Sequence, residues 1–115
     1  MNPRIYHFCL RLQERYGITP NDGIIDSIME QIHTRSASLL RREKRSTGEV
    51  LHLLVRVLGR PVWIIFSQRH EILITAVPMP ILCVGQPLYK VYELLTDPSH
   101  SHLLYFDRKS KTFQD

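Results

Sequence analysis

The sequence lacks the long apolar runs and the dense cysteine pattern that mark membrane proteins and disulfide-rich secreted domains. No run approaches the roughly 18 apolar residues of a membrane span, and no signal-peptide hydrophobic region lies near residue 1. The two cysteines, Cys9 and Cys83, lie far apart in apolar company, which is typical of buried thiols in a reducing compartment. We therefore expect a cytoplasmic protein that does not contact a membrane.

Motifs for cofactor and metal chemistry are missing as well. The chain has no CxxC pair, no glycine-rich phosphate-binding loop and no motif for a nucleophilic serine or cysteine. His100 and His102 have a spacing that two metal ligands can adopt, but no third ligand lies near them, which favours an exposed turn. We expect no cofactor and no metal.

Length and charge limit the architecture and favour one class of partner. The 115 residues suffice for a single domain spanning 1–115, and 43% hydrophobic with 23% charged residues is ordinary for a globular protein. The chain has 15 Lys and Arg residues against 11 Asp and Glu residues, a net charge of +4. This small excess favours an anionic partner such as nucleic acid.

The N-terminal third predicts two helices. In the first, apolar residues at positions 5, 8, 12 and 16 form a stripe, and Gly17 is placed to end the helix. In the second, Thr19 suits the cap and Pro20 the first helical position. The buried stripe of this second helix comprises Ile25, Ile28, Met29 and Ile32.

The middle of the chain predicts antiparallel strands. We expect them over residues 37–42, 50–58, 62–66 and 72–77, and the last three are apolar on both faces, so helices should cover at least one side. The prediction is an α+β fold in which two N-terminal helices pack on an antiparallel β-sheet. A C-terminal extension, 79–115, follows this 1–78 core. It contains an apolar run over 81–84, a helix over 88–95, a loop over 96–102 and an edge strand over 103–106.

Polar residues stand out within the apolar strands. His52 and Arg56 share one face of their strand, and Thr75 interrupts an apolar run. An arginine in such a strand is costly unless it is paired or faces a cleft. For His52 and Thr75 the alternative is an ordinary structural role in the sheet. For Arg56 the structural alternative is an ion pair with one of three glutamates: Glu14, Glu43 or Glu49.

Two groups of charged residues are candidates for binding. His7, Arg11, Glu14 and Arg15 recur at helical spacing and project from one side of the first helix, where a weakly paired, solvated face is the alternative. A second group surrounds the first predicted hairpin, where a solvated hairpin is the alternative. Its members are Arg35, Arg41, Arg42, Lys44 and Arg45.

The order of these elements, with two short motifs, resembles RelE-like toxins and small phage proteins of the barnase–EndoU–colicin D–RelE superfamily. The likeness covers residues 4–78, in the stretches "HFCLRLQERYGI" and "VRVLGRPVWIIFSQRHEILITAVP". Paired strands of such proteins read R-V-x-G-x-x-V-x-V-x-Y and I-x-T-V-L-P. Here the first begins at Arg56 and has Phe66 near the tyrosine position, and the second spans 72–78 and retains Thr75.

The resemblance implies a metal-independent ribonuclease of the toxin or phage-effector type, which cleaves RNA by attack of the 2′-hydroxyl on phosphate. His7 would act as base or acid, Arg11 and Arg56 would hold the phosphate, and Thr75 would donate a hydroxyl hydrogen bond. These four residues should then share one cleft under the first helix. The residues expected to bind RNA are Arg15, Arg41, Arg42, Lys44 and Arg45.

A second hypothesis is a catalytically inactive protein of the same fold that binds a phage or host protein, or nucleic acid. The C-terminal extension departs from the family pattern and favours this alternative, because it can cover the cleft or offer a surface to a partner. RNA is the expected partner in the first case and a possible one in the second. A cognate antitoxin, an immunity protein or a host protein would be the protein partner.

Overall fold

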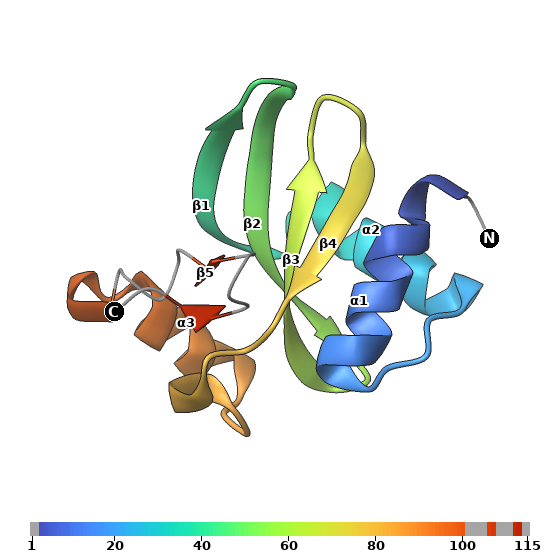
Figure 1. Cartoon of the computed structure of the whole chain (residues 1–115). Coiled ribbons are helices and arrows are strands. Elements are labelled where there is room, and N and C mark those ends of the chain that lie inside the picture. Colours follow the sequence, from blue (N-terminus) through green and yellow to red (C-terminus); the bar gives the residue numbers. More distant parts are fainter. Residues whose placement is uncertain (1–2, 101–105, 108–111, 114–115) are drawn as a thin grey trace.

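A four-stranded antiparallel sheet with helices on both faces forms the body of the protein in the computed structural model (Figure 1). The structure describes residues 3–100, 106–107 and 112–113. The strands lie in chain order: β1 (Ser38–Arg45), β2 (Gly48–Val57), β3 (Arg60–Ser67) and β4 (Ile72–Val77). The α+β class and the antiparallel sheet are therefore confirmed.

The sheet separates two apolar cores, because successive side chains of a strand point to opposite faces. Helices α1 (Tyr6–Tyr16) and α2 (Asp22–His33) cover one face, and helix α3 (Leu88–Thr96) covers the other. The first core includes Phe8, Leu12, Ile28, Val55 and Ile64. The second includes Leu54, Trp63, Ile65, Val91 and Leu95.

Helix α3 corrects the expected arrangement, in which N-terminal helices alone packed on the sheet. Its predicted range, 88–95, agrees with the observed helix, but Val91 and Leu95 are fully buried against the second face. β2 and β3 bury side chains on both faces, so this second face also needs a cover. Part of the C-terminal extension thus belongs to the core of the protein.

Helix α2 begins later than predicted. Asn21 caps it, since its side-chain oxygen accepts a hydrogen bond from the N–H of Ile24 (2.9 Å). Thr19 and Pro20 stay in the preceding connection. Asparagine ranks with the best capping residues, so it competes successfully with a threonine two positions earlier. Helix α1 ends as expected, with Gly17 in a left-handed conformation (φ 66°).

The remaining boundaries differ in detail from the prediction. β1 continues to Arg45 because the turn to β2 is short, and the apolar run 81–84 contains a 3₁₀ turn, η2 (Ile81–Cys83). A 3₁₀ turn, η1 (Pro3–Ile5), precedes α1. β5 (Phe106–Asp107) pairs with β6 (Thr112–Phe113) in a separate two-stranded sheet, and most of the strand predicted over 103–106 lies outside the described residues.

Tyr16, the last residue of α1, ties the helix to the sheet. Its hydroxyl donates to the carbonyl of Val77 (2.6 Å) and accepts from the backbone N–H of Trp63 (3.0 Å). Trp63 and Val77 face each other across β3 and β4, so the hydroxyl bridges the two strands. Burial raises the pKa of the Tyr16 phenol above its ordinary value, which keeps the group neutral at pH 7.

We expect Tyr16→Phe to lower the free energy of unfolding by about 2 kcal/mol, because a buried carbonyl and a buried N–H lose their partner while the ring packing is kept. Urea unfolding followed by fluorescence measures this change. Tyr89→Phe is the matched control, because Tyr89 is 71% exposed and should change stability very little. Equal stabilities of the two variants would show that the hydroxyl bridge does not stabilise the fold.

Candidate nucleic-acid interface

The first two predicted catalytic residues lie on α1. His7 is exposed on this helix, one turn before Arg11. Arg11 is half-buried and donates a hydrogen bond to the carboxylate of Glu14 (2.6 Å). Arg11 and Glu14 thus form an ion pair on the charged side of α1. Both residues belong to the helix that packs on the first face of the sheet.

Thr75 belongs to the opposite face of the sheet. It lies across from Ile65, which is part of the core under α3, and residues directly opposite each other in antiparallel strands point to the same side. Thr75 is only 6% exposed. The sheet therefore stands between Thr75 and the helix that carries His7 and Arg11. The structure does not bring these residues into the single cleft that the sequence predicted.

Arg56 is exposed, which also corrects the prediction. β1 pairs with β2 only as far as Leu54, so β2 continues past the end of its neighbour. The amide of Gln31 takes the place of that neighbour: it donates to the carbonyl of Arg56 (2.8 Å) and accepts from its N–H (2.8 Å). Within residues 4–100 the three glutamates considered as partners of Arg56 pair with other arginines. Glu14 pairs with Arg11, Glu43 with Arg41 and Arg45, and Glu49 with Arg42.

A buried histidine connects three strands on the second face. His52 is 4% exposed, its Nδ1 accepts a hydrogen bond from the indole N–H of Trp63 (3.1 Å), and its Nε2 lies 2.8 Å from the carboxylate of Glu43. Because the indole can only donate, Nδ1 carries no proton and Nε2–H donates to Glu43. Burial lowers the pKa of His52 to about 4, against the opposing effect of Glu43. The ring is therefore neutral at pH 7.

The carboxylate of Glu43 is the centre of a small charged cluster. It accepts hydrogen bonds from His52, from Arg41 (3.0 Å) and from Arg45 (2.8 and 3.4 Å). Partial burial alone would raise the pKa of Glu43, but the hydrogen bonds and charges of Arg45 and His52 outweigh it and lower the pKa to about 2. The cluster fixes two guanidinium groups on β1 and leaves Glu43 a weak proton acceptor at neutral pH.

One hairpin carries a third of the Lys and Arg residues of the protein. We call residues 38–57, strands β1 and β2 with their turn, the basic hairpin; it has five cations against two carboxylates. β1 is an edge strand, and its cations point to both sides of the sheet. Arg41 and Arg45 are half-buried beside Glu43, and Arg42 pairs with Glu49 (2.8 Å). Of the four cations on β1, Arg42 and Lys44 are exposed.

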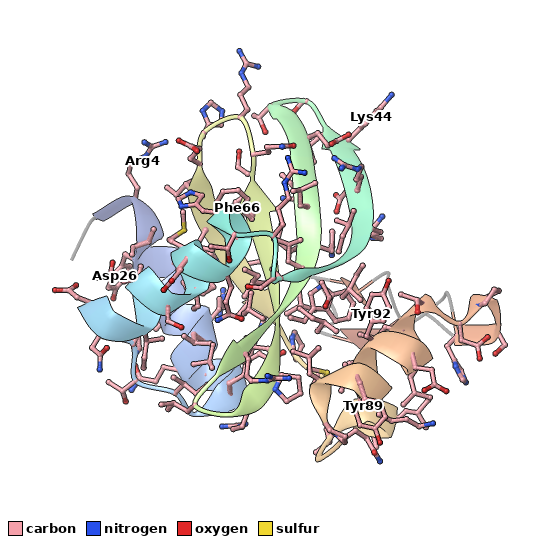
Figure 2. The ribbon with its side chains drawn as sticks, turned by 180° about the vertical axis from the view of Figure 1, so that it is seen from behind. Arg4, Asp26, Lys44, Phe66, Tyr89 and Tyr92 are labelled. Atoms are coloured by element: carbon pink, nitrogen blue, oxygen red, sulfur yellow. The ribbon has the colours of Figure 1, made fainter. Side chains whose placement is uncertain are left out.

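An arginine from the turn between β3 and β4 lies beside the tip of the basic hairpin. Arg69, in the turn between β3 and β4, lies against Gly48, where a Cβ would come within 3.4 Å of its side chain. Lys44 extends from β1 away from the body of the protein (Figure 2). Arg15 is not part of this surface: it donates to the carbonyl of Ala76 (2.7 Å) near the other end of β4.

Comparisons with known proteins add no family: no family model, curated protein or solved structure matches the chain.

Among the described residues there is no cluster of three His, Cys, Asp or Glu side chains that would hold a metal. His102 of the predicted histidine pair lies outside those residues, and His100 is half-buried beside Asp97. In the same part of the chain, no helix is both long and apolar enough to span a membrane. The geometry is therefore the basis for any functional proposal.

Sequence reasoning missed the residue at the centre of the interface. Glu43 was considered only as a partner for Arg56, whereas it organises Arg41, Arg45 and His52. The available signal was a glutamate two positions from each of two arginines, because such residues share a face once the strand is extended beyond the predicted range 37–42. The contact with His52 depends on the register of β1 against β2, which no local pattern reports.

The neutral state of His52 predicts a loss of stability in acid. Its pKa in the folded protein, about 4, lies below its ordinary 6.5, so the unfolded chain binds the proton more readily. Stability should fall as the pH drops from about 6.5 to about 4, by at most about 3 kcal/mol. Glu43 continues the loss below its ordinary 4.5, down to about 2.

Urea unfolding at a series of pH values tests this assignment. His52→Gln should flatten the dependence between pH 6.5 and 4, whatever its effect on stability at pH 7. His70→Gln, at an exposed position in a turn, should keep the wild-type dependence. A wild-type slope in the His52→Gln protein would mean that another group causes the acid sensitivity.

Proposed function

We propose that the protein binds RNA through the basic hairpin and does not cleave it. The observation that carries this proposal is the edge strand β1, whose cations line both of its sides and outnumber the nearby carboxylates. Phosphate neutralisation needs little more than such a row of charges. This role is that of a catalytically inactive protein with a RelE-like fold, the alternative that the sequence left open.

The charged cluster around Glu43 supports binding by holding its arginines in place. An arginine loses side-chain freedom when it contacts a phosphate, and a side chain that is already fixed loses less. Arg41 and Arg45 are held by one carboxylate, so two positive charges share one negative charge. A guanidinium has five N–H donors in a planar fork, which suits phosphate oxygens.

The positions of the titratable groups speak against cleavage. Attack by a 2′-hydroxyl needs a base and an acid whose pKa values lie near the working pH. Glu43, with a pKa of about 2, is a poor base, and His52 is buried and neutral. His7 lies on the helix that packs on the other face of the sheet from Thr75. We therefore propose His7 as a surface residue and not as a catalytic one.

Binding of fluorescent single-stranded RNA at several salt concentrations tests the proposal. The double variant Arg42→Gln, Lys44→Gln should bind more weakly, because it removes two cations from β1. The slope of log K against log salt should become shallower by about 1.4, since each phosphate contact on a single strand contributes about 0.7. The two sites are exposed, so folding should be unaffected.

The matched control removes the same charge elsewhere. Arg4→Gln, Lys90→Gln also deletes two cations, one from η1 and one from α3. Arg4 lies on the other side of the molecule from Lys44 (Figure 2). This control variant should keep the wild-type slope. Equal losses in both double variants would show that only net charge matters and would contradict a specific interface.

Incubation of the purified protein with the labelled RNA separates binding from catalysis. We expect the RNA to remain intact on a denaturing gel, and His7→Ala to bind RNA as the wild type does. Cleavage that His7→Ala reduces about 100-fold, the effect expected of a lost general acid or base, would overturn the proposal in favour of a ribonuclease.

A further inference from the structure

Helix α3 presents two tyrosine rings to solvent. Tyr89 is 71% exposed and Tyr92 is 41% exposed. They lie three residues apart, so they occupy the same flank of the helix. Val91 and Leu95 are fully buried against the second face of the sheet, which holds the helix in place. A tyrosine on a fixed helix offers a large flat surface and loses little conformational freedom when a ligand stacks on it.

The tyrosines share the second face of the sheet with the charged cluster of β1. Arg41 lies directly opposite the buried His52 in the register of β1 and β2, so its side chain points to the second face. Leu40, the residue before Arg41, packs in the same core as Val91, the residue before Tyr92. Figure 2 shows Tyr92 on the side of α3 that is nearer the strands. The arginines of β1 and the tyrosines of α3 therefore lie on one side of the sheet.

Lys90 belongs to a different flank of α3. It follows Tyr89 by one residue and precedes Tyr92 by two, so it points about 100° and about 160° away from them around the helix axis. It pairs with Glu93 (3.6 Å). The flank that carries the tyrosines is therefore aromatic and not basic, and Lys90 is a suitable control position for charge on this helix.

We infer that Tyr89 and Tyr92 stack on unpaired bases of the bound RNA, which makes single-stranded RNA the substrate class. This inference rests on the RNA binding proposed above. The cations of β1 complement the phosphates of such a strand, and the rings on the same side of the sheet complement its bases. Stacking needs bases that are not enclosed in a duplex. Every base has an aromatic face, so we expect little dependence on the sequence of the RNA.

Two RNA probes test the inference on the unmodified protein by fluorescence anisotropy. One is a single strand of about ten nucleotides, and the other is an abasic strand of the same length, which keeps the phosphates and lacks the bases. The abasic strand should bind about tenfold more weakly. Equal affinity for the two strands would overturn the inference and leave charge-based binding in place. No binding of either strand would contradict the RNA interface and the inference with it.

Substitution of the two rings tests their part directly. Tyr89→Leu, Tyr92→Leu should weaken binding of the single strand about tenfold or more and keep the wild-type salt slope, since stacking releases no counterions. Tyr89→Phe, Tyr92→Phe retains the rings and should bind like the wild type. Tyr6→Leu is the matched control, because Tyr6 is 67% exposed on the helix that covers the other face.

The abasic strand also shows whether the leucine variant is folded. This variant should bind the abasic strand and an RNA duplex as the wild type does, because neither offers an accessible base to stack on a ring. Wild-type affinity for the single strand in the leucine variant would overturn the inference. So would an equal loss in Tyr6→Leu.

Discussion

A sheet with two apolar faces is the constraint on which the rest of the structure depends. β2 and β3 bury side chains on both faces, so each face needs a helical cover. α1 and α2 provide one cover and α3 the other, which makes the segment after Pro78 part of the core. The same sheet is a barrier between α1 and Thr75. Polar sites on this fold can therefore form on one face, at the edge strand or at the ends of the strands.

Two buried polar side chains accept hydrogen bonds from Trp63, and burial keeps both of them neutral. The backbone N–H of Trp63 donates to the hydroxyl of Tyr16, and its indole N–H donates to His52. Each acceptor also donates a hydrogen bond: the hydroxyl of Tyr16 donates to the carbonyl of Val77, and the ring of His52 donates to the carboxylate of Glu43. Both groups stay neutral at pH 7, so neither brings a charge into the interior of the sheet.

The spacing of apolar residues predicted the helices and strands. The pairing of distant segments determines which polar residues lie close together. Helix α3 and strands β2 to β4 follow from the spacing of apolar residues, which is a local property. The local sequence does not determine on which face of the sheet α1 packs. For that reason the expected cleft around Thr75 was wrong. On β1 a bulge between Leu39 and Arg41 shifts the register. Simple alternation fails there, and the partnership of Glu43 and His52 could not be predicted from the sequence.

The two basic regions of the protein differ in what holds their cations. On the basic hairpin, a carboxylate pairs with Arg42, and an exposed pair of this kind is worth little, so a polyanion can replace it at small cost. At the other end of the strands, main-chain carbonyls accept hydrogen bonds from Arg15 and Arg60. The charge of the hairpin lies along an edge strand and is therefore open to solvent and sensitive to salt.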